Sequence, residues 1–551
     1  MIVSADRQVT LSKKDLLSYI FTEPKQFNTN EPIYIDTTDP VRTVSFIQAR
    51  NLVRRLITGL RAAGLQTHDC VAVHAANNLH YTLFVLAIIG AGGVFTGTNP
   101  FYRPLELEHH LRTSHARFVI VEFEHARSLL DVAEKLDIPV KNIWVYHSDE
   151  SMIKSLKMRS WKTLLNYDPS DWVCPREPKK TTAARFFSSG TTGLPKAVEL
   201  THHNLLAQHS LVFEAHPRPY QMSFLVALPI FHAAMAPLVH IGALRSGIKM
   251  YIMSRFEINR YLKMIDRFAI TDLIVVPPIL HAMVASVPQN RFALRSLRNV
   301  VCGAAPLSRE MQAKAKSLLG PDVPLTQGWG MTESCCASTM FPYPECDETG
   351  SVGRLVPNME ARLLDANGRP ISTHNTPGEL YIRGPTVTPG YYDNPMANKA
   401  TFDADDWLRT GDIATYNFET RKWYIIGRRK DMIKVQGFQV SPSEIEAVLL
   451  MHPGVEDVAV VGIVGVGCER SRSEQPRAYV VPLPGDKTIS EESLRLYVAE
   501  RLSKYKHLSG GVEFVDAIPR NASGKILRQN LSRGGIKLDG TQAADGIVSK
   551  I

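Results

Sequence analysis

Short runs of continuously apolar and β-branched residues recur through the first half of the chain. They lie at Cys70–Ala75, Arg117–Glu122, Met222–Ile230, Asp272–Pro278 and Arg298–Ala305. None shows the alternation of apolar and polar positions that marks a strand with one solvated face, so each predicts a strand buried on both faces of a parallel sheet. Segments with a helical pattern, such as "YLKMIDRFAI", separate the runs. The pattern therefore predicts an α/β architecture.

The pattern changes from about Gly353 onward, where the apolar segments become shorter and polar turns separate them. Ala361–Ile371, Gly378–Gly384 and Lys422–Gly427 have the character of strands, and Asn-Gly and Pro-Gly pairs punctuate this region. Such pairs are typical of tight turns between strands. We expect a smaller β-rich subdomain here.

A strongly charged run, Arg428–Asp431, follows this subdomain. Four consecutive charges do not fit a core, so the run predicts an exposed connector. Beyond it, Ser441 and Pro442 predict the start of a helix, with Ser441 as N-cap and Glu444 reaching back in a capping box.

The last part of the chain predicts a compact α+β unit. Val455–Gly465 and Arg477–Leu483 have the character of strands and follow the predicted helix. We expect two domains, at residues 1–427 and 428–551, with a flexible polar tail from about residue 532.

Composition and charge narrow the class of protein. The 551 residues are 44% hydrophobic and 21% charged, which is typical of a globular protein with several domains. The net charge is +9, from 63 basic and 54 acidic residues. No basic run with interleaved aromatic residues occurs, so the excess charge favours anionic small molecules and gives little support for nucleic-acid binding.

The apolar and cysteine content argues for an intracellular protein that does not span a membrane. The most apolar run, Thr82–Phe95, is shorter than the ~20 residues that cross a bilayer, and its three glycines predict a buried helix leading into a turn. The N-terminus lacks the apolar stretch of a signal peptide. Seven cysteines without a Cys-x-x-Cys pair predict reduced thiols and no zinc site.

A small, hydroxyl-rich loop ends in a lysine at "FFSSGTTGLPK", residues Phe186–Lys196. Its glycines would let backbone N–H groups approach anionic oxygens, and its hydroxyls and Lys196 add donors. Lys196 has no glycine before it and no Ser or Thr after it, which disfavours a P-loop nucleotide-binding motif. Alone, the loop fits either a phosphate cradle or a solvated turn. The residues concerned are Ser188, Ser189, Gly190, Thr191, Thr192 and Gly193.

The segment Ser188–Asn204 resembles the signature loop of the adenylate-forming superfamily, which contains acyl-CoA synthetases, plant coumarate–CoA ligases, beetle luciferases and peptide-synthetase adenylation domains. Segments similar to the other motifs of this family follow in the family's order, at Leu228–Met235, Cys302–Pro306, Gln327–Ser334, Gly378–Tyr392, Trp407–Asp412, Gly427–Glu446 and Pro519–Arg528. The ordered set is far more specific than any one motif.

The resemblance implies a fold and a reaction. The fold is α/β, with a large N-terminal domain of two stacked α/β subdomains and a β-rich subdomain, and a small mobile α+β C-terminal domain. In the reaction, a carboxylate attacks the α-phosphorus of ATP to give an acyl-adenylate and pyrophosphate. The thiol of coenzyme A then takes the acyl group. Both first reactants are anions, so the site must neutralise charge and align them.

The resemblance also assigns nucleotide contacts. Thr191, Thr192 and Lys196 would hold the β- and γ-phosphates, and Glu333 with Thr191 would hold Mg²⁺. Asp412 would accept hydrogen bonds from the ribose hydroxyls, and Trp329 would stack on adenine. The remaining nucleotide-binding positions are Gly303, Ala304, Ala305, Pro306, Gln327, Gly328, Gly330, Met331, Thr332 and Arg428.

The implied catalytic lysine is Lys525, whose ammonium would bridge the substrate carboxylate and the α-phosphate. Thioester formation would then need rotation of the C-terminal domain about a hinge at Lys430. After rotation, Lys434, Gly437 and Gln439 would line the channel for the pantetheine arm, although Lys434 and Gln439 also fit a plain polar strand surface. His232 resembles the residue that opens for the thiol.

The acid-binding residues depart from one branch of the family. Ala234 stands where hydroxycinnamate-activating relatives carry a tyrosine, and Ala233 and Leu238 are also apolar. These residues favour a largely apolar aliphatic or aryl acid over coumarate. Trp329 replaces the tyrosine common in its motif, a change between aromatic residues.

Several functional hypotheses follow from the sequence. The first is an AMP-forming acyl-CoA ligase that uses ATP, Mg²⁺ and coenzyme A, in peroxisomal or secondary metabolism. The second is an adenylation enzyme that loads a carrier-protein pantetheine. A luciferase-like monooxygenase and an inactive nucleotide-binding protein fit the pocket and the intact motifs less well.

The chain ends in Ser549-Lys550-Ile551, one conservative step from the peroxisomal address Ser-Lys-Leu. This ending predicts recognition by the peroxisomal import receptor. A cytoplasmic location follows where the signal is not read.

Overall fold

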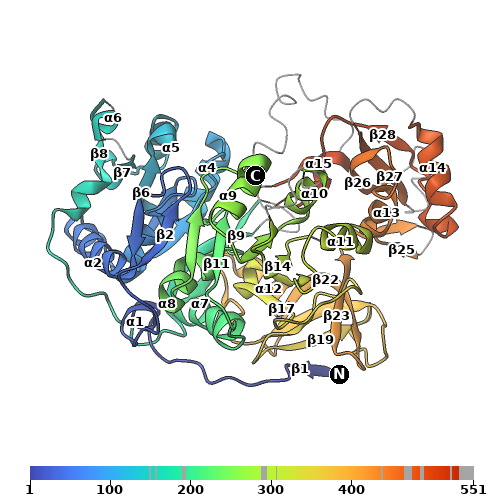
Figure 1. Ribbon diagram of the computed structural model, residues 1–551, viewed down its shortest axis with the longest axis horizontal. Helices are drawn as coiled ribbons and strands as arrows, with labels where there is room; N and C mark the ends of the chain where they lie inside the picture. Colours follow the sequence, from blue (N-terminus) through green and yellow to red (C-terminus); the bar gives the residue numbers. More distant parts are fainter. Residues whose placement is uncertain are drawn as a thin grey trace.

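The computed structural model describes the chain in ten stretches. They are residues 1–147, 150–155, 158–188, 194–286, 294–305, 307–435, 438–464, 474–483, 489–521 and 524–532. Figure 1 shows two α/β layers in blue and green, an antiparallel sheet in yellow and orange, and a separate C-terminal unit in red. The predicted fold class is confirmed.

The first α/β layer is an eight-stranded sheet in the order β21-β10-β9-β5-β4-β6-β7-β8. Its strands are β4 (Cys70–His74), β5 (Val94–Gly97), β6 (Ala116–Glu122), β7 (Ile143–Tyr146), β8 (Arg159–Ser160), β9 (Thr182–Ser188), β10 (Lys196–Thr201) and β21 (Gly390–Tyr391). The central strands β5, β4, β6 and β7 are parallel. All residues of β4 are buried, as continuous hydrophobicity predicts. The helices of this layer are α2 (Phe46–Ala62), α3 (Tyr81–Gly90), α4 (Pro104–Ser114), α5 (Ala126–Lys135) and α6 (Glu150–Ser155).

The apolar run Thr82–Phe95 contains both a helix and the beginning of a strand. Every residue of α3 is buried, which confirms the predicted helix. A turn follows in which Gly92 has φ +91°, and β5 begins at Val94. Sequence analysis missed this strand because its first residues continue the apolar run of the helix.

The second α/β layer is a seven-stranded sheet in the order β15-β14-β13-β11-β12-β2-β3. Its strands are β2 (Pro32–Asp36), β3 (Thr43–Ser45), β11 (Ser223–Val226), β12 (Lys249–Ile252), β13 (Asp272–Val275), β14 (Asn299–Cys302) and β15 (Leu325–Gln327). All neighbours are parallel except β2 and β3. The helices are α1 (Leu16–Phe21), α7 (His202–His209), α8 (Ala243–Ser246), α9 (Ile258–Arg267), α10 (Pro277–Ser286) and α11 (Arg309–Lys316).

One apolar core joins the two layers. It contains Phe95 and Ile120 of the first sheet together with Val226 and Val275 of the second. Burial of apolar surface is the main favourable contribution to folding, so a shared core stacks the two sheets as one body. Their packing positions the ends of β9, β11 and β14 around the site described below.

The β-rich part is an antiparallel five-stranded sheet in the order β1-β19-β20-β22-β23. The strands are β1 (Ile2–Ser4), β19 (Glu360–Leu364), β20 (Gly378–Arg383), β22 (Leu408–Asn417) and β23 (Lys422–Arg428). Leu380, Ala414 and Trp423 belong to its own core. A small sheet of β16 (Trp329–Met331), β17 (Cys336–Met340) and β18 (Arg354–Leu355) lies beside it, and α12 (Pro395–Thr401) follows β21. The predicted β-rich subdomain is confirmed, with the N-terminal strand β1 as an unpredicted member.

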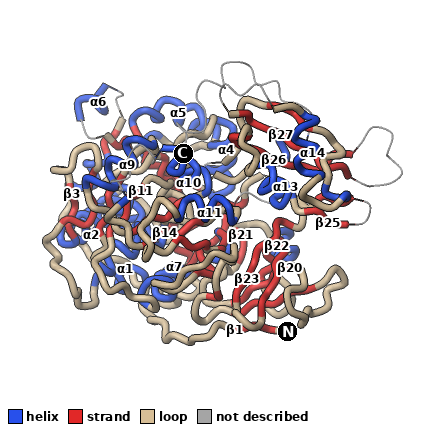
Figure 2. The backbone as a smooth tube through the Cα atoms, turned by 45° about the vertical axis from the view of Figure 1, so that its right-hand side comes forward, coloured by secondary structure: helices blue, strands red, loops and turns tan. Residues whose placement is uncertain are grey.

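The C-terminal unit has α+β structure, as predicted. It contains β24 (Ile433–Val435), β25 (Phe438–Val440), α13 (Pro442–Leu449), β26 (Val455–Val464), β27 (Glu474–Pro482), α14 (Glu491–Ala499), β28 (Val512–Phe514) and α15 (Arg528–Ser532). Leu449, Val458 and Val480 form part of its separate core. Figure 2 shows this unit projecting from the rest of the chain.

The predicted start of α13 is confirmed, but the predicted capping box is wrong. Ser441 is the N-cap and Pro442 the first helical residue, without a side-chain cap. The Ser441 hydroxyl instead donates to the carbonyl of Ile426 at 2.8 Å, and the Glu444 carboxylate pairs with Lys506. Both side chains therefore interact with residues that are distant in the sequence, and the local capping hydrogen bonds do not form.

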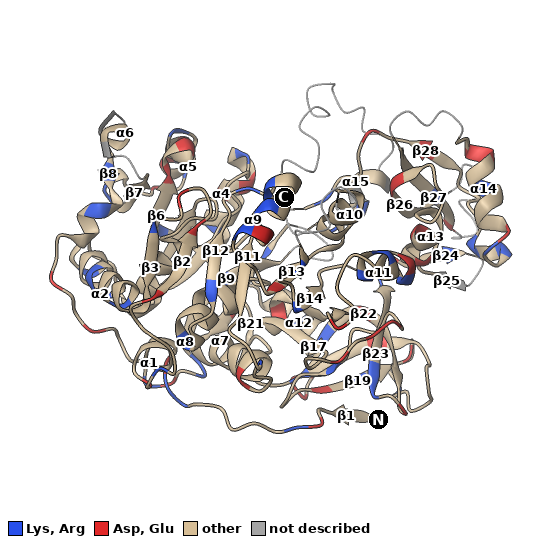
Figure 3. Cartoon of the chain, viewed as in Figure 1, with Lys and Arg blue, Asp and Glu red and all other residues tan. Residues whose placement is uncertain are grey.

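Lys and Arg positions are interspersed with Asp and Glu positions along the chain (Figure 3). In the charged connector, Arg429 and Lys430 are exposed, whereas Arg428 ends β23 and is half-buried. No helix within the described stretches is long and apolar enough to cross a membrane. The cysteines of these stretches are free thiols, at Cys70, Cys174, Cys302, Cys335, Cys336 and Cys346.

Candidate active site

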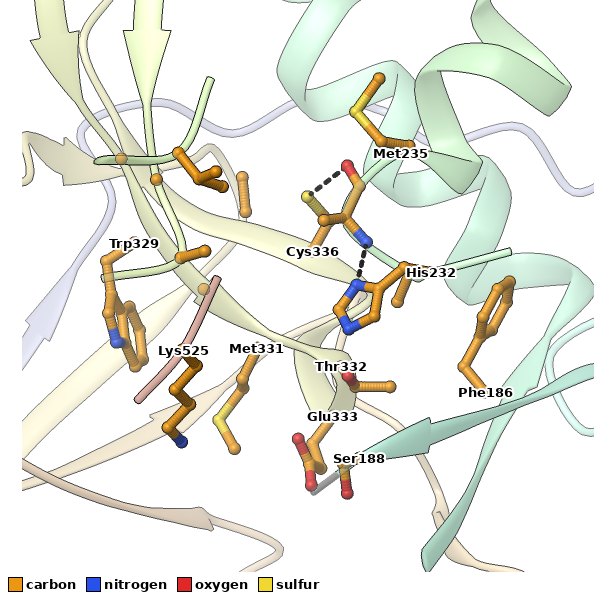
Figure 4. Close-up of a pocket in the computed structure, with 18 of the residues that line it drawn as sticks. Phe186, Ser188, His232, Met235, Trp329, Met331, Thr332, Glu333, Cys336 and Lys525 are labelled. Atoms are coloured by element: carbon orange, nitrogen blue, oxygen red, sulfur yellow. Dashed lines mark hydrogen bonds between the residues drawn. The ribbon is translucent and has the colours of Figure 1, made fainter. Parts of the chain in front are cut away.

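A cavity of about 1100 Å³ lies where the sheets meet, and every part of the fold contributes to its wall. Lys196 comes from the first layer and His232 from the loop after β11 of the second. Arg428 comes from the end of the antiparallel sheet, and Lys525 from the C-terminal unit. Figure 4 shows Lys525, His232, Glu333 and Ser188 around this space.

Glu333 lies in a buried turn, the short 3-10 helix Thr332–Ser334 between β16 and β17. A Cβ at Gly330 would lie 1.6 Å from the carbonyl oxygen of Cys336, so only glycine permits this close approach. The Glu333 side chain is fixed by the Tyr391 hydroxyl, which donates to Oε1 at 2.9 Å. A carboxylate has about four lone-pair sites, so Glu333 keeps capacity for a cation or donor in the cavity.

Asp412 is held by two donors from different sheets. Trp329 Nε1 donates to Oδ2 at 2.9 Å, and Arg428 Nε pairs with Oδ1 at 2.6 Å. Asp412 is 3% exposed, and burial raises the pKa of its carboxyl, while the Arg428 charge opposes that shift. The arrangement fixes the carboxylate beside the Trp329 ring, where a ribose and an aromatic base could be recognised together.

Lys525 reaches the cavity from a tight turn of the C-terminal unit. Its N–H donates to Asn521 Oδ1 at 2.8 Å, and Gly524 adopts φ +79°. A Cβ at Gly524 would lie 3.5 Å from side-chain atoms of Val276 and Pro278, so the turn sits at the carboxyl end of β13. Figure 4 shows the lysine side chain beside Trp329 and Met331.

The surroundings of Lys525 lower the pKa of its ammonium. Burial lowers the pKa of Lys525 to about 8, and the nearby Arg428 charge adds to this effect, while Asp412 opposes it. A partly desolvated ammonium binds an incoming anion more strongly than a solvated one. Lys525 is therefore suited to meet negative charge that a reaction brings into the cavity.

His232 is held as a neutral imidazole against the backbone of Ala234. The Ala234 N–H donates to His232 Nδ1 at 3.3 Å, and the Cys336 thiol donates to the Ala234 carbonyl at 3.3 Å (Figure 4). Burial lowers the pKa of His232 to about 4, so the ring is uncharged near neutral pH. Because Nδ1 accepts a hydrogen bond, the ring hydrogen lies on Nε2.

Beyond His232 the cavity becomes apolar. Ala233, Ala234 and Leu238 line it, as do Phe186 and Met235. Further apolar lining comes from the strands of the second sheet and from β17, at Phe224, Ile274, Val301, Met340 and Phe341. This compartment can hold an apolar chain or ring of considerable size.

Comparison with family models decides the assignment. The AMP-binding enzyme model matches residues 21–392, and the model of the AMP-binding enzyme C-terminal domain matches residues 444–525. The chain belongs to the AMP-binding enzyme family. The resemblance that the motifs predicted is thereby confirmed.

This chain is similar over nearly its whole length to two ligases of Aspergillus niger. It is 47% identical to "Phenylacetyl-CoA ligase epaB" of Aspergillus niger, over 96% of this chain and 98% of that protein. It is 46% identical to "Acyl-CoA ligase azaF" of Aspergillus niger, over 96% and 100% respectively. At this level of similarity the enzyme is an acid–thiol ligase of the AMP-forming acyl-CoA synthetase type.

Solved structures share the fold of this AMP-binding enzyme. ATP-bound MatB from Rhodopseudomonas palustris is 25% identical with a TM-score of 0.81, covering 94% of this chain and 98% of that one. An anthranilate CoA ligase in complex with anthranoyl-AMP is 24% identical with a TM-score of 0.83, covering 95% and 97%. The second likeness shows the fold alone.

Most of the predicted site residues that the structure describes lie together in the AMP-binding enzyme. Those that line the cavity are Ser188, Lys196, His232, Ala233, Ala234, Leu238, Gly303, Ala304, Gly328, Trp329, Gly330, Met331, Thr332, Glu333, Arg428, Lys430, Lys434 and Lys525. Asp412 joins them through Trp329 and Arg428. Their roles toward ATP, acid and coenzyme A remain predictions.

Other predicted residues are placed differently. Gln327 is 5% exposed, and its amide accepts from the Leu307 N–H and donates to Gln312, so it braces the backbone. Neither Gln327 nor Ala305 is among the described residues that line the cavity. Outside the described residues lie Ser189, Gly190, Thr191, Thr192, Gly193, Pro306 and Gly437, as do the side chain of Gln439, the predicted tail beyond residue 532 and Ser549–Ile551.

Sequence analysis missed three side chains of the site. Tyr391 fixes Glu333, and the Lys196 ammonium lies 4.8 Å from the centre of its ring. Cys336 holds the Ala234 peptide, and Arg218 lines the apolar compartment. Tyr391 and Cys336 lie in or beside recognised motifs, but Arg218 lies in none.

Proposed function

We propose that this enzyme uses ATP and Mg²⁺ to activate a largely apolar aliphatic or aryl carboxylic acid as its acyl-adenylate, and then transfers the acyl group to free coenzyme A. The observation that carries the proposal is the convergence of Lys525, Glu333 and the Asp412–Trp329 pair on a cavity with an apolar compartment. The relative named for phenylacetyl-CoA supports an aryl acid of this kind.

In the first half-reaction the substrate carboxylate attacks the α-phosphorus of ATP, and pyrophosphate leaves. Charge builds up on the α-phosphate oxygens in the transition state, and a positioned cation stabilises that charge most effectively where water is excluded. We assign this role to Lys525, because it is a partly desolvated ammonium that lines the cavity. Asp412 orients the ribose, and Lys196 acts on the departing phosphates.

The residues present fit a magnesium ion that is shared with the nucleotide. Glu333 supplies a buried carboxylate with one oxygen fixed by Tyr391. Within the described stretches no group of three or more His, Cys, Asp or Glu could hold a metal by itself. Mg²⁺ commonly uses one or two carboxylates together with phosphate oxygens. When bound, it would neutralise the triphosphate, while Glu333 keeps it in place.

Thioester formation needs the cavity mouth to change, because Lys525 stands at the reacting phosphate. We expect the C-terminal unit to rotate about Lys430, which is exposed in the present arrangement. Lys434 is also exposed, on the short hairpin of β24 and β25. Rotation would bring this hairpin toward the pantetheine arm, and His232 would give way to the thiol.

The cellular setting follows from the C-terminal Ser-Lys-Ile. We propose import into peroxisomes through recognition of Ser549–Ile551, with a role in peroxisomal or secondary metabolism. Deletion of these three residues from a fluorescently tagged chain should leave it in the cytoplasm. Unchanged organellar targeting would refute this part of the proposal.

The test of the reaction is a panel of carboxylic acids assayed for AMP release with and without coenzyme A. We expect acid-dependent AMP release that coenzyme A accelerates, with aryl and aliphatic acids ahead of coumarate. A holo carrier protein in place of coenzyme A is the matched control for the alternative function. Faster turnover with the carrier than with coenzyme A would overturn the choice of thiol.

A further inference from the structure

Arg218 is a partly buried cation in the wall of the apolar compartment. It precedes β11 and lines the cavity. Its Nη1 is fully enclosed and has no hydrogen-bond partner among the described residues. A guanidinium carries five N–H donors, and buried polar groups are ordinarily paired. A guanidinium that lines a substrate cavity and is incompletely paired by the described residues can take an acceptor from a ligand, through the donors that face the cavity.

The surroundings hold Arg218 in place without neutralising it fully. Its Cζ lies 4.8 Å from the centre of the Tyr343 ring, and Tyr343 packs edge-on against Tyr220 at 5.6 Å. Asp272 acts on Arg218 electrostatically, but its oxygens accept from the hydroxyls of Tyr220 at 3.1 Å and of Thr271 at 2.7 Å. Stacking therefore positions the guanidinium, while these two hydrogen bonds of Asp272 come from other donors.

The strand register locates Arg218 at the end of the cavity opposite Lys525. The Lys525 turn packs on Val276, at the carboxyl end of β13. Asp272, which acts on Arg218, lies at the amino end of β13, in register with Asn299 and Phe224. Both of these neighbours line the cavity. Gly303 lies four residue steps after Asn299, which corresponds to about 13 Å along the strand.

Strand β17 gives the same order. At its start, Cys336 contacts the Ala234 peptide that holds His232. Past its end, Phe341 lines the cavity and Tyr343 lies under the Arg218 guanidinium. Along both sets of strands, the residues therefore run from the side of Lys525 and His232 to the side of Arg218.

We propose that Arg218 binds an anionic oxygen at the far end of the acid, a second carboxylate in the simplest case. The preferred substrate then has an apolar middle and a distal acceptor, and the plain apolar acid is its weaker analogue. This inference rests on the proposed function, because it places the acid in this cavity. Guanidinium and carboxylate form paired, charge-assisted hydrogen bonds, which are among the strongest in proteins.

The experiment compares matched acids on matched variants. The acids are straight-chain monocarboxylates of increasing length, each with its α,ω-dicarboxylate, and phenylacetate with its 4-carboxy derivative. The variant Arg218→Met keeps side-chain length and removes the charge. Arg298→Met is the control, since the exposed Arg298 stacks on Tyr220 at 4.9 Å but is not among the described residues lining the cavity.

For the native enzyme we expect kcat/KM for the best-fitting diacid to exceed that of its monoacid by about tenfold to a hundredfold. Arg218→Met should abolish this preference and leave the monoacid within a few-fold, and Arg298→Met should preserve it. Arg218→Lys keeps the charge without the paired geometry, so it should retain a reduced preference even if the methionine variant folds poorly. Equal use of both acids by the native enzyme at every length would overturn the proposal.

Calorimetric titration of the same acid pairs separates this inference from the proposed function. Diacid binding that Arg218→Met weakens, without AMP release from any acid, would refute the ligase and keep the anchor. Rapid turnover of monoacids, with diacids bound no better by native enzyme than by Arg218→Met, would refute the anchor and keep the ligase.

Discussion

The two ends of the cavity differ in how their charges are paired. At the end that we propose binds the nucleotide, Asp412 is held by Trp329 and Arg428, and Glu333 by Tyr391. At the end that we propose binds the acid, the enclosed Nη1 of Arg218 has no hydrogen-bond partner in the part of the chain that the structure describes. The nucleotide end is thus organised in advance, whereas a substrate group would complete the acid end.

This difference assigns separate tasks to the two ends. Preorganised polar groups stabilise a transition state without reorganising during the reaction, and that suits the chemistry common to all acids. An unpaired donor instead strengthens the binding of a substrate that supplies an acceptor. A substrate without an acceptor leaves the donor unpaired and binds more weakly. A substitution at the first end can therefore change the rate of adenylation while the preference between acids stays the same. A substitution at the second end can change that preference while the adenylation machinery stays intact.

Removal of the Lys525 ammonium should have the largest effect. Lys525→Ala is expected to slow acid-dependent ATP–pyrophosphate exchange by about a hundredfold to a thousandfold, the cost of losing one donor to transition-state charge. Attack of coenzyme A on supplied acyl-adenylate should largely survive. Lys434→Ala is the matched control and should spare exchange; equal loss of both half-reactions in Lys525→Ala would contradict the assignment.

Breaking the pairing at the nucleotide end should come next. Asp412→Asn leaves the half-buried Arg428 beside a neutral group; breaking a fully buried pair costs about 3–5 kcal/mol, so we expect a smaller loss of stability here. We expect a lower melting temperature and a KM for ATP raised about tenfold or more, with selection between acids unchanged. Arg429→Met, which removes a more exposed partner of Glu379, is the control for general effects of charge. A changed ranking of acids in Asp412→Asn would show that the two ends are coupled.

The pH dependence of adenylation should follow the Lys525 ammonium. Because burial lowers its pKa to about 8, the charged form predominates below that pH and is lost above it. In the free enzyme, kcat/KM for exchange should be full near neutral pH and fall about tenfold per pH unit well above the midpoint. Lys525→Arg stays charged and should lack this alkaline fall, even if it is slower. An identical profile in both proteins would assign the titration to another group.

The smallest expected effect concerns the hydrogen bond that supports His232. Cys336→Ala removes the thiol that donates to the Ala234 carbonyl and should cost about 1 kcal/mol of positioning, a few-fold in the thioester step. Cys336→Ser keeps a donor and should restore most of the rate, whereas exchange should be normal in both. A loss that serine does not rescue would point to packing and not to the hydrogen bond.

Much of the fold could be predicted from the sequence because its signals are local. The strand β4 is apolar and fully buried, and the turn-rich strands of the antiparallel sheet are equally plain in the sequence. Where partners come from afar, local reasoning failed. Ser441 bonds to Ile426 and not within its helix, and β1 pairs with β19, more than three hundred residues away.

The site divides in the same way. Lys525, Glu333 and Asp412 each lie within a short continuous motif. The ordered series of these motifs resembles that of one family, and this resemblance predicted all three residues. Tyr391 reaches Glu333 across 58 residues, and Arg218 meets Tyr343 only because the fold brings the loop after β17 to the segment before β11. The sequence does not distinguish a single arginine in a polar segment from a surface arginine. The role proposed for Arg218 depends on its burial and its pairing, which only the folded structure shows.

The most direct test is a crystal structure with a non-hydrolysable acyl-adenylate analogue that carries a distal carboxylate. The account predicts Lys525 Nζ within hydrogen-bond distance of the group that replaces the phosphate, Asp412 on the ribose hydroxyls and Arg218 on the distal carboxylate. Two results would contradict the account. In the first, the acyl chain of the analogue lies outside the apolar compartment that Ala234 and Phe341 line. In the second, Lys525 points away from the phosphate mimic although the C-terminal unit has not moved.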